Sequence, residues 1–508
     1  MGNLSVVLQS GRASQRTEGS FAAFRASRRS LSRGAIALLW LAMAATAPRA
    51  DGLAPAGELG LRTAEFLAEL VRIPSVNPPG AEAPVAERVA AELAGAGLEV
   101  RVIPTPRSNP ADPERAAVWA QLPGRGDAPP LVLLSHLDVV PADPGAWSHP
   151  PFSGEIEGGK VYGRGTLDAK GVTAIHVATL LELARRDEPL GRDIIFLATP
   201  DEETGGRDGA AFMLENHPEL LGNAEFLLTE GGSIRPARSD REGMPSVPPL
   251  WGVTVTEKGP CWLELTSRGT PGHGSAPRPD AAIPRLIEAL DRVRRIESPI
   301  RVIDEVASMF RALAPSAPRE DREGFASLAQ GLKNDASFRR RFLGNPGYAA
   351  LVRNTISITV LEGGSSTNVV PGHASARLDA RLLPGEDCTA FREALGEIIA
   401  DSRVEIDELL AFPSRSSASD TLLFSAIERV AHRENPEALV VPRMIAGFTD
   451  AHWFRERGIV AYGFVPRWLG PADSRGVHGV DENVSVANLE AGVLTLIAIL
   501  EELEVLSE

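Results

Sequence analysis

Three short apolar segments that run directly into acidic residues or histidine constrain the fold of this chain more than any other feature. The segments are residues 131–134, 194–199 and 226–229, and helical patterns separate them along the chain. Strands that alternate with helices predict a mainly parallel sheet with helices on both faces. Ligands of such sheets bind beyond the carboxyl ends of the strands. The polar residues that follow the three segments are His136, Asp138, Asp201, Glu202, Glu203 and Glu230.

The pattern changes after residue 256, where strands and helices follow one another in the order β-α-β-β-α-β. That order predicts a smaller α/β domain, which contains a charged helical insertion at 299–350. The earlier pattern returns from residue 412 and ends in a helix at 485–503. We therefore expect an α/β fold in which a mainly parallel-sheet catalytic domain, 51–256 and 412–508, is interrupted by a smaller α/β domain, 257–411.

The charge of the chain is divided unevenly, and this excludes one class of partner. The first 50 residues hold seven arginines and one acidic residue, whereas the remainder carries 45 basic and 66 acidic residues. A body this acidic is a poor partner for nucleic acid, whose phosphates need cations. The two cysteines, Cys261 and Cys388, are too few for a disulfide scaffold or a thiolate zinc cluster. We expect them to be plain buried residues, with a single disulfide as the alternative.

The first 50 residues have the character of a targeting segment. Four arginines, at positions 25, 28, 29 and 33, precede an apolar run at 35–47. A helix of that length spans only ~20 Å, which is short of a ~30 Å hydrocarbon core. We therefore predict an export signal of the secretory kind, with a twin-arginine signal or an uncleaved anchor as alternatives. The mature chain is expected to have no integral membrane span and to be periplasmic or secreted.

Five motifs place histidines and carboxylates at the expected strand ends and in nearby loops. Each alone has an ordinary reading as a core histidine, a helix cap or a solvated acidic loop. Together they supply imidazole and hard oxygen ligands, which suit zinc, with cobalt or manganese as substitutes. Two such ions could clamp a hydroxide and a carbonyl oxygen. The motifs are His136-x-Asp138, Gly163-Arg-Gly-x-x-Asp168-x-Lys-Gly, Asp201-Glu-Glu, Glu230-Gly-Gly and the late His478.

In combination these motifs resemble one family over residues 60–503. The family comprises the two-zinc peptidases and amidohydrolases that include acetylornithine deacetylase, succinyl-diaminopimelate desuccinylase, aminoacylase and carboxypeptidase S. Three stretches are similar to the branch of carboxypeptidase S and the N-acyl amino acid hydrolases. They are 138–142 with 147–154, the insertion 299–350, and 478–485.

The resemblance implies a role for each motif residue. His136 and Glu230 would hold one zinc ion, Glu203 and His478 the other, and Asp168 would bridge both. Asp138 would fix the ring of His136, and Glu202 would act as the general base and then the general acid. The resemblance also implies a cis peptide bond at Asp168-Ala169.

The interrupting domain, 257–411, resembles the lid of this family. His273, in a Gly- and Pro-rich turn, would bind the developing oxyanion, in some members within the site of a partner subunit. Asn368 and Arg381 would grip the substrate carboxylate, and we expect the turn between them to bring both to one rim. The alternatives are a plain turn for His273 and Asn368 and a surface charge for Arg381. The segment 447–451 would border the pocket.

We therefore expect an exported enzyme with two Zn²⁺ ions per chain, in which metal-activated water and a Glu base cleave amide bonds. The substrate would be a small peptide cut at its C-terminal residue or an N-acyl amino acid, and the motifs do not separate these two. A homodimer through the lid is a further expectation. One rival is a binding protein on a catalytically inactive peptidase fold. Another is a two-zinc aminopeptidase without a lid, which the inserted domain disfavours.

Overall fold

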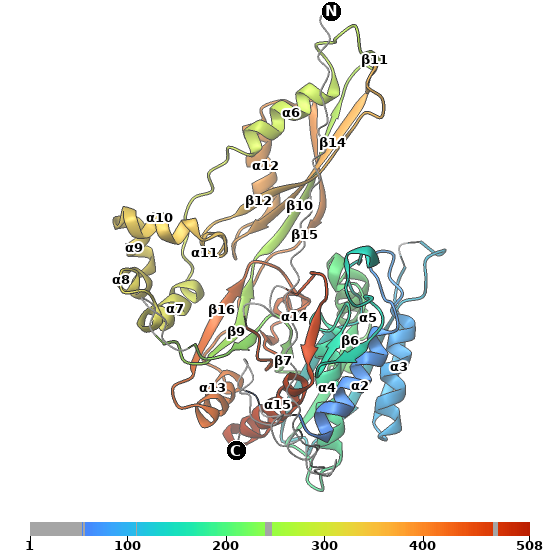
Figure 1. Ribbon diagram of the computed structural model, residues 1–508, viewed down its shortest axis with the longest axis vertical. Coiled ribbons are helices and arrows are strands. Elements are labelled where there is room, and N and C mark those ends of the chain that lie inside the picture. The colour runs from blue at the N-terminus through green and yellow to red at the C-terminus, as the bar shows by residue number, and fades with distance from the viewer. Residues whose placement is uncertain (1–52, 54–55, 108, 239–245, 471–475, 508) are drawn as a thin grey trace, which may run out of the picture. The chain divides into compact units, whose positions relative to one another are not determined.

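The computed structural model describes residues 53, 56–107, 109–238, 246–470 and 476–507, which belong to one compact unit spanning 51–508 (Figure 1). Its larger sheet has nine strands. The pairs β6–β3, β3–β7, β7–β17 and β16–β9 are parallel. In spatial order the strands are β1 (Glu99–Pro104), β2 (Ala116–Leu122), β6 (Arg192–Thr199), β3 (Ala128–His136), β7 (Phe226–Thr229), β17 (Val460–Gly463), β9 (Leu250–Glu257) and β16 (Leu439–Ile445), with β8 (Ser233–Arg235) paired to β9.

The central strands are buried on both faces, because alternate side chains enter two different cores. In β3, Leu131 and Leu133 join one core, whereas Val132 and Leu134 join the other. Continuous apolar runs are typical of strands in a parallel sheet with helices on both faces. The helices against the first core are α2 (Glu58–Val71), α3 (Ala83–Gly95), α4 (Lys170–Ala184), α13 (Leu422–Glu434) and α15 (Val486–Ser507), and those against the second are α5 (Phe212–Asn216) and α14 (Ala451–Glu456).

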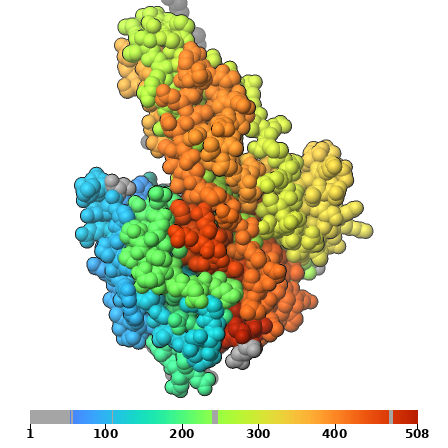
Figure 2. All heavy atoms as spheres, turned by 180° about the vertical axis from the view of Figure 1, so that it is seen from behind, coloured from blue at the N-terminus to red at the C-terminus, as the bar shows by residue number. Residues whose placement is uncertain are grey.

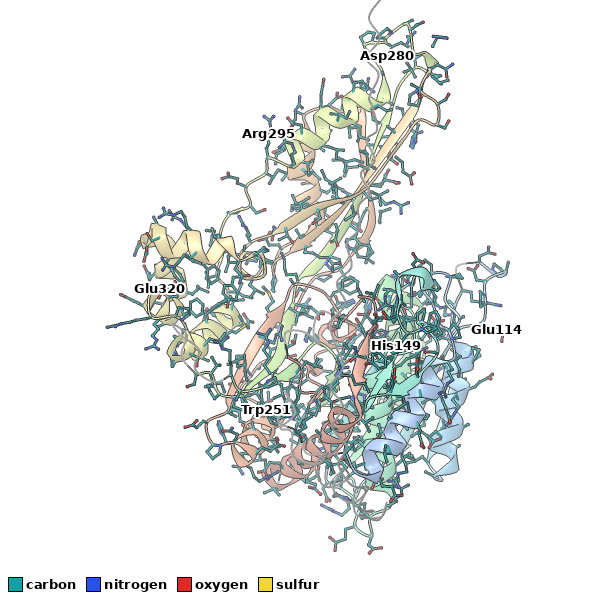
Figure 3. The ribbon with its side chains drawn as sticks, in the orientation of Figure 1. Glu114, His149, Trp251, Asp280, Arg295 and Glu320 are labelled. Atoms are coloured by element: carbon teal, nitrogen blue, oxygen red, sulfur yellow. A yellow bond between two sulfur atoms is a disulfide. The ribbon has the colours of Figure 1, made fainter. Side chains whose placement is uncertain are left out.

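A second sheet of four strands is built from residues 259–411. Its strands are antiparallel and have the order β12-β14-β10-β15. Figure 3 labels Asp280, which lies at the same end of this sheet as the short strand pair β11–β13. The elements are β10 (Gly259–Arg268), β11 (Gly272–His273), α6 (Ala282–Val293), β12 (Thr355–Gly363), β13 (Val369–Val370), β14 (His373–Leu382), α12 (Cys388–Ile399) and β15 (Val404–Ala411).

Cys261 and Cys388 form a disulfide that joins β10 to the first residue of α12. The expectation of two plain buried cysteines was therefore wrong, and the single-disulfide alternative holds. The sequence could not decide this, because the two positions lie 127 residues apart. They meet only once α12 packs beside the sheet, where Cys261 is fully buried and Cys388 is partly buried.

The segment 299–350 is helical, as expected, and has an aromatic core of its own. Phe310 contacts both Phe325 and Phe342 edge-on or tilted. The first helix of the segment packs on β16, so the insertion covers that edge of the larger sheet. Figure 2 shows it in yellow beside the orange segments. Its helices are α7 (Asp304–Leu313), α8 (Arg322–Ala326), α9 (Leu328–Asn334), α10 (Ala336–Gly344) and α11 (Pro346–Ala350).

The mixed α/β fold with a mainly parallel central sheet confirms the expected fold class. The expected export signal lies at positions outside the described residues. In the part of the chain that the structure describes, no helix is both long enough and apolar enough to cross a membrane. A small sheet of β4 (Glu155–Glu157), β5 (Lys160–Tyr162) and β18 (Asn483–Ser485) completes the fold.

Candidate active site

Three neighbouring parallel strands bring the first set of candidate residues to one edge of the larger sheet. β3 pairs with β6 on one side, with His136 opposite Thr199, and with β7 on the other. The carboxyl ends of parallel strands point in the same direction. His136 at the end of β3 therefore lies near the acidic residues that follow β6 and β7.

Asp168 stands between the two histidines, with one carboxylate oxygen toward each. Its Oδ1 lies 3.0 Å from Nε2 of His136, and its Oδ2 lies 3.2 Å from Nε2 of His478. The peptide bond that follows Asp168 is cis, as the resemblance implied. His478 reaches the site from a loop in which its own φ is +57°. This arrangement is what a carboxylate bridging two cations requires.

Two further carboxylates complete two groups of three potential metal ligands, and both groups contain Asp168. His136 and Asp168 are joined by Glu230, whose Oε1 lies 3.4 Å from Nε2 of His136. Asp168 and His478 are joined by Glu203, whose Oε2 lies 3.3 Å from Nε2 of His478. The other oxygen of Glu203, Oε1, is buried and accepts no hydrogen bond from a described residue.

The electrostatics of the cluster favour a bound cation. Burial raises the pKa of Glu230 to about 7, and the nearby charge of Asp168 adds to that shift. Burial also raises the pKa of Glu203. Burial alone would lower the pKa of His136, but Glu230 and the hydrogen-bonded carboxylates raise it well above its usual range. Crowded carboxylates of this kind are relieved by a cation, so the residues fit a pair of divalent metal ions.

Glu202 lies outside the two groups that share Asp168, but it forms a third potential ligand group with His136 and Glu203. It is buried, and no described residue donates a hydrogen bond to its carboxylate. Burial raises the pKa of Glu202 well above its usual range, and the charge of Glu230 adds to the effect. A carboxyl with a raised pKa at a pocket wall has the properties of a group that moves a proton.

Asp138 positions both the histidine and the acidic loop. It is fully buried, and its Oδ1 lies 3.4 Å from Nδ1 of His136. Its two oxygens also accept hydrogen bonds from the backbone N–H groups of Glu202 and Glu203. Nδ1 of His136 also lies 3.0 Å from the backbone carbonyl oxygen of Asp138, so Asp138 fixes the imidazole partly through its backbone and the two acidic residues through its carboxylate.

Several supporting residues were missed by the sequence analysis. Buried Glu482 accepts hydrogen bonds from the backbone N–H groups of Leu167 and Asp168, and so holds the loop that carries Asp168. Arg115 pairs with Asp201, the first acid of the Asp-Glu-Glu motif, which anchors the loop instead of facing the cluster. The position of Glu482 in the motif that carries His478 was a signal for its role. Arg115 carried no such signal, since it precedes β2 in an ordinary segment.

A pocket of about 260 Å³ opens over the cluster and includes residues of the second sheet. Arg381 of β14 lines it, stacked over the rings of Trp262 and Phe448. Asp379 accepts two hydrogen bonds from the guanidinium of Arg381, at 2.6 and 3.1 Å. The remaining nitrogen, Nη1, has no partner among the described residues. Arg381 thus has one donor group left for a ligand.

His273 and Asn368 do not line this pocket. They meet each other at the β11–β13 pair, where the backbone N–H of Gly274 donates to the carbonyl of Asn368. The expectation that Asn368 and Arg381 share a rim is wrong, because Asn368 precedes β14 and Arg381 lies near its end. Eight residues of strand separate His373 from Arg381, which is ~27 Å at about 3.4 Å per residue.

Histidines and carboxylates lie together at the carboxyl ends of a parallel sheet, in a pocket that also includes residues of the second sheet. These features define the class of the protein, which is a metal-dependent hydrolase. Residues 132–502 match the family described as Peptidase family M20/M25/M40. The chain belongs to this family, and it is a hydrolytic enzyme.

Relatives in this family carry two kinds of name. The human N-fatty-acyl-amino acid synthase/hydrolase PM20D1 is 31% identical over 72% of each chain. A probable carboxypeptidase S-like 2 of Dictyostelium discoideum is 28% identical over 71% of this chain and 69% of its own. Among solved structures, an M20 family metallo-carboxypeptidase of Sulfolobus solfataricus has the same fold. Its TM-score is 0.66 at 20% identity, over 87% of this chain and 99% of its own.

Proposed function

We propose that this enzyme hydrolyses the amide bond of N-acyl amino acids or the C-terminal bond of small peptides. The observation that carries the proposal is the pocket in which Glu202, the histidine–carboxylate cluster and Arg381 face one space. One end of that space can hold a scissile amide, and the other can hold a free carboxylate.

The metal residues of the proposal are those of the two ligand groups. His136 and Glu230 would hold one ion, Glu203 and His478 the other, with Asp168 shared. Two Zn²⁺ ions, or Co²⁺ or Mn²⁺ in their place, would supply Lewis-acid polarisation of a carbonyl and a water of lowered pKa. The orphaned oxygen of Glu203 supports this assignment.

Glu202 takes the proton from the attacking water and returns it to the departing amine. Its burial supports this role, because a raised pKa brings a carboxyl closer to neutral pH, where it can both accept and release a proton. Asp138 keeps the Glu202 backbone and the His136 ring in place throughout.

Arg381 binds the free carboxylate of the substrate through its unpartnered nitrogen. Asp379 and the two aromatic rings hold the guanidinium in one orientation, which lowers the entropy lost on binding. Trp262, Phe448 and Val140 give the same pocket apolar walls, which favours substrates with apolar groups.

In our proposal, His273 and Asn368 of one chain act at the active site of a second copy of the chain. Both are exposed, and among the described residues their side chains form only local hydrogen bonds, between Ser275 and His273 and between Ser366 and Asn368. A homodimer through the lid would place them over the pocket of the partner subunit. Export of the enzyme, by a signal within the first 50 residues, is part of the same proposal.

The test is turnover by the purified, zinc-loaded enzyme on N-acyl amino acids of rising acyl length and on C-terminal dipeptides. We expect cleavage of at least one series, with a preference for substrates that carry apolar groups. Absence of turnover on both series at full metal loading would favour the inactive binding protein. Mixing Glu202→Gln with His273→Ala chains tests the dimer, because a shared site would regain activity from two inactive parents.

A further inference from the structure

A second cavity lies outside the active site, between the larger sheet and the helical insertion. Its volume is about 470 Å³, compared with about 260 Å³ for the active-site pocket. Strands β8, β9 and β16 form one wall, and α7 with the start of α11 forms the other. Cavities of about 300–1,000 Å³ are typical of sites for small organic ligands.

The helical wall and part of the strand wall are apolar. Met309 and Leu313 of α7 face Leu250 and Met444 across the cavity, and Leu351 closes it after α11. Met309 and Met444 are buried, and the others are partly buried. Methionine and leucine walls adapt to flexible aliphatic chains.

The strand wall of the cavity also carries two arginines. Arg443 of β16 and Arg235 of β8 both line it, and none of the described lining residues is acidic. No described residue forms an ion pair or a side-chain hydrogen bond with either guanidinium. Burial, with the charge of Arg235 added, lowers the pKa of Arg443 to about 10. Charges removed from water are normally paired, and partly buried Arg443 has no acidic partner among the described residues.

The backbone is shaped to accommodate Arg443. A Cβ atom on Gly252 of β9 would lie 2.9 Å from Cδ and 3.3 Å from Nη1 of Arg443. The guanidinium therefore lies across the strand at a position where any other residue would displace it. Ser233, Asn345 and Tyr348 add hydrogen-bonding residues to the cavity wall.

We propose that this cavity is a binding site for an amphipathic carboxylate, such as a long-chain fatty acid. The carboxylate would pair with Arg443 and Arg235, and the aliphatic chain would lie along Met309, Leu313 and Leu351. Inorganic anions would leave the apolar part unfilled, and neutral lipids would leave the arginines unpaired. The proposal does not depend on the reaction catalysed in the active site.

The test is displacement of cis-parinaric acid, a fluorescent long-chain carboxylate, from the zinc-loaded full-length enzyme. We expect hexadecanoate to displace it, with hexadecanol at least about tenfold weaker because it lacks the charge, and inorganic phosphate without effect. Arg443→Gln should weaken hexadecanoate about tenfold or more, whereas Arg429→Gln, an exposed arginine of α13, should leave it unchanged. Should Arg443→Gln fail to fold, exposed Arg235→Gln provides the same comparison.

Two further measurements separate this cavity from the active site. Leu313→Trp should weaken hexadecanoate by at least about fivefold and leave octanoate within about twofold, because it narrows the apolar helical wall along which only the longer chain extends. A short N-acetyl amino acid, which fits the active-site pocket, should not displace the probe from the Glu202→Gln enzyme. Equal binding of hexadecanoate and hexadecanol, an unchanged affinity of both arginine variants, or displacement by the N-acetyl amino acid would overturn the proposal.

Discussion

The metal-ligand cluster and the tip of the lid both carry motif residues, but the fold determines their positions in different ways. The loops of the cluster are held by partners from distant parts of the chain, such as Asp138 on the backbone of Glu202 and Glu482 on the Asp168 loop. At the tip, the side chain of His273 forms hydrogen bonds with Ser275, two residues away, and with no other residue that the structure describes.

The difference shows what a buried sheet edge contributes to a site. Strand register alone brings three motifs to one place, and buried carboxylates then fix the loops that carry them. The lid tip is fixed only within its own β11–β13 pair, so its function depends on what the tip faces. Substitutions in the cluster at the sheet edge and substitutions in the lid should therefore have different effects.

The largest effect is expected at Asp168, the residue that both ligand groups share. Asp168→Ala should remove most bound metal together with activity, because it would withdraw an oxygen from each ion. Metal content by mass spectrometry and turnover should fall together, whereas Asp187→Ala, on an exposed loop, should change neither. Two ions per chain in the Asp168 variant would exclude the bridging role.

Substitution of Glu202 should lower turnover without loss of bound metal. Glu202→Gln keeps the size of the side chain but cannot accept a proton, so kcat should fall about 10²–10⁴-fold with two ions still bound. Exposed Glu215→Gln serves as the control. Wild-type turnover in the Glu202 variant would assign the proton transfer to another group.

Arg381 belongs to the lid but lines the pocket over the cluster. Its substitution therefore tests whether a lid residue contributes to substrate binding in the same chain. Arg381→Ala should lower kcat/KM on a free-acid substrate by ~2–4 kcal/mol, the scale of a lost charge-assisted contact. On the matching amide the loss should be much smaller, and Arg381→Lys should restore only part of it. Arg377→Ala, on the same strand, is the control. Equal losses on acid and amide would give Arg381 a purely structural role.

The smallest effect on turnover is expected at the disulfide. Replacing both Cys261 and Cys388 by serine should lower the free energy of unfolding by about 2–4 kcal/mol, since the bond closes a long loop. Metal content and kcat at low temperature should remain near wild type, because the cluster takes no support from α12. Calorimetric unfolding of both proteins measures the change, and an unaltered Tm would contradict it.

The sequence predicted the parts of the molecule that depend on local pattern and strand order. The apolar runs before His136, Glu202 and Glu230 were short but continuous, which made both the strands and their common edge predictable. Partners such as Arg115 for Asp201 could not be found, because nothing in a single sequence links residues 86 positions apart. The same reason hid the disulfide, whose cysteines lie 127 positions apart.

The central claim is that two metal ions, held by five histidine and carboxylate ligands, give this pocket its hydrolase activity. The most direct measurement is turnover during stepwise return of zinc to enzyme that a chelator has stripped of metal. Metal-free enzyme should be inactive while still folded, and activity should reach its maximum at two equivalents of zinc per chain. Full turnover without metal, or a maximum at one equivalent, would contradict the account.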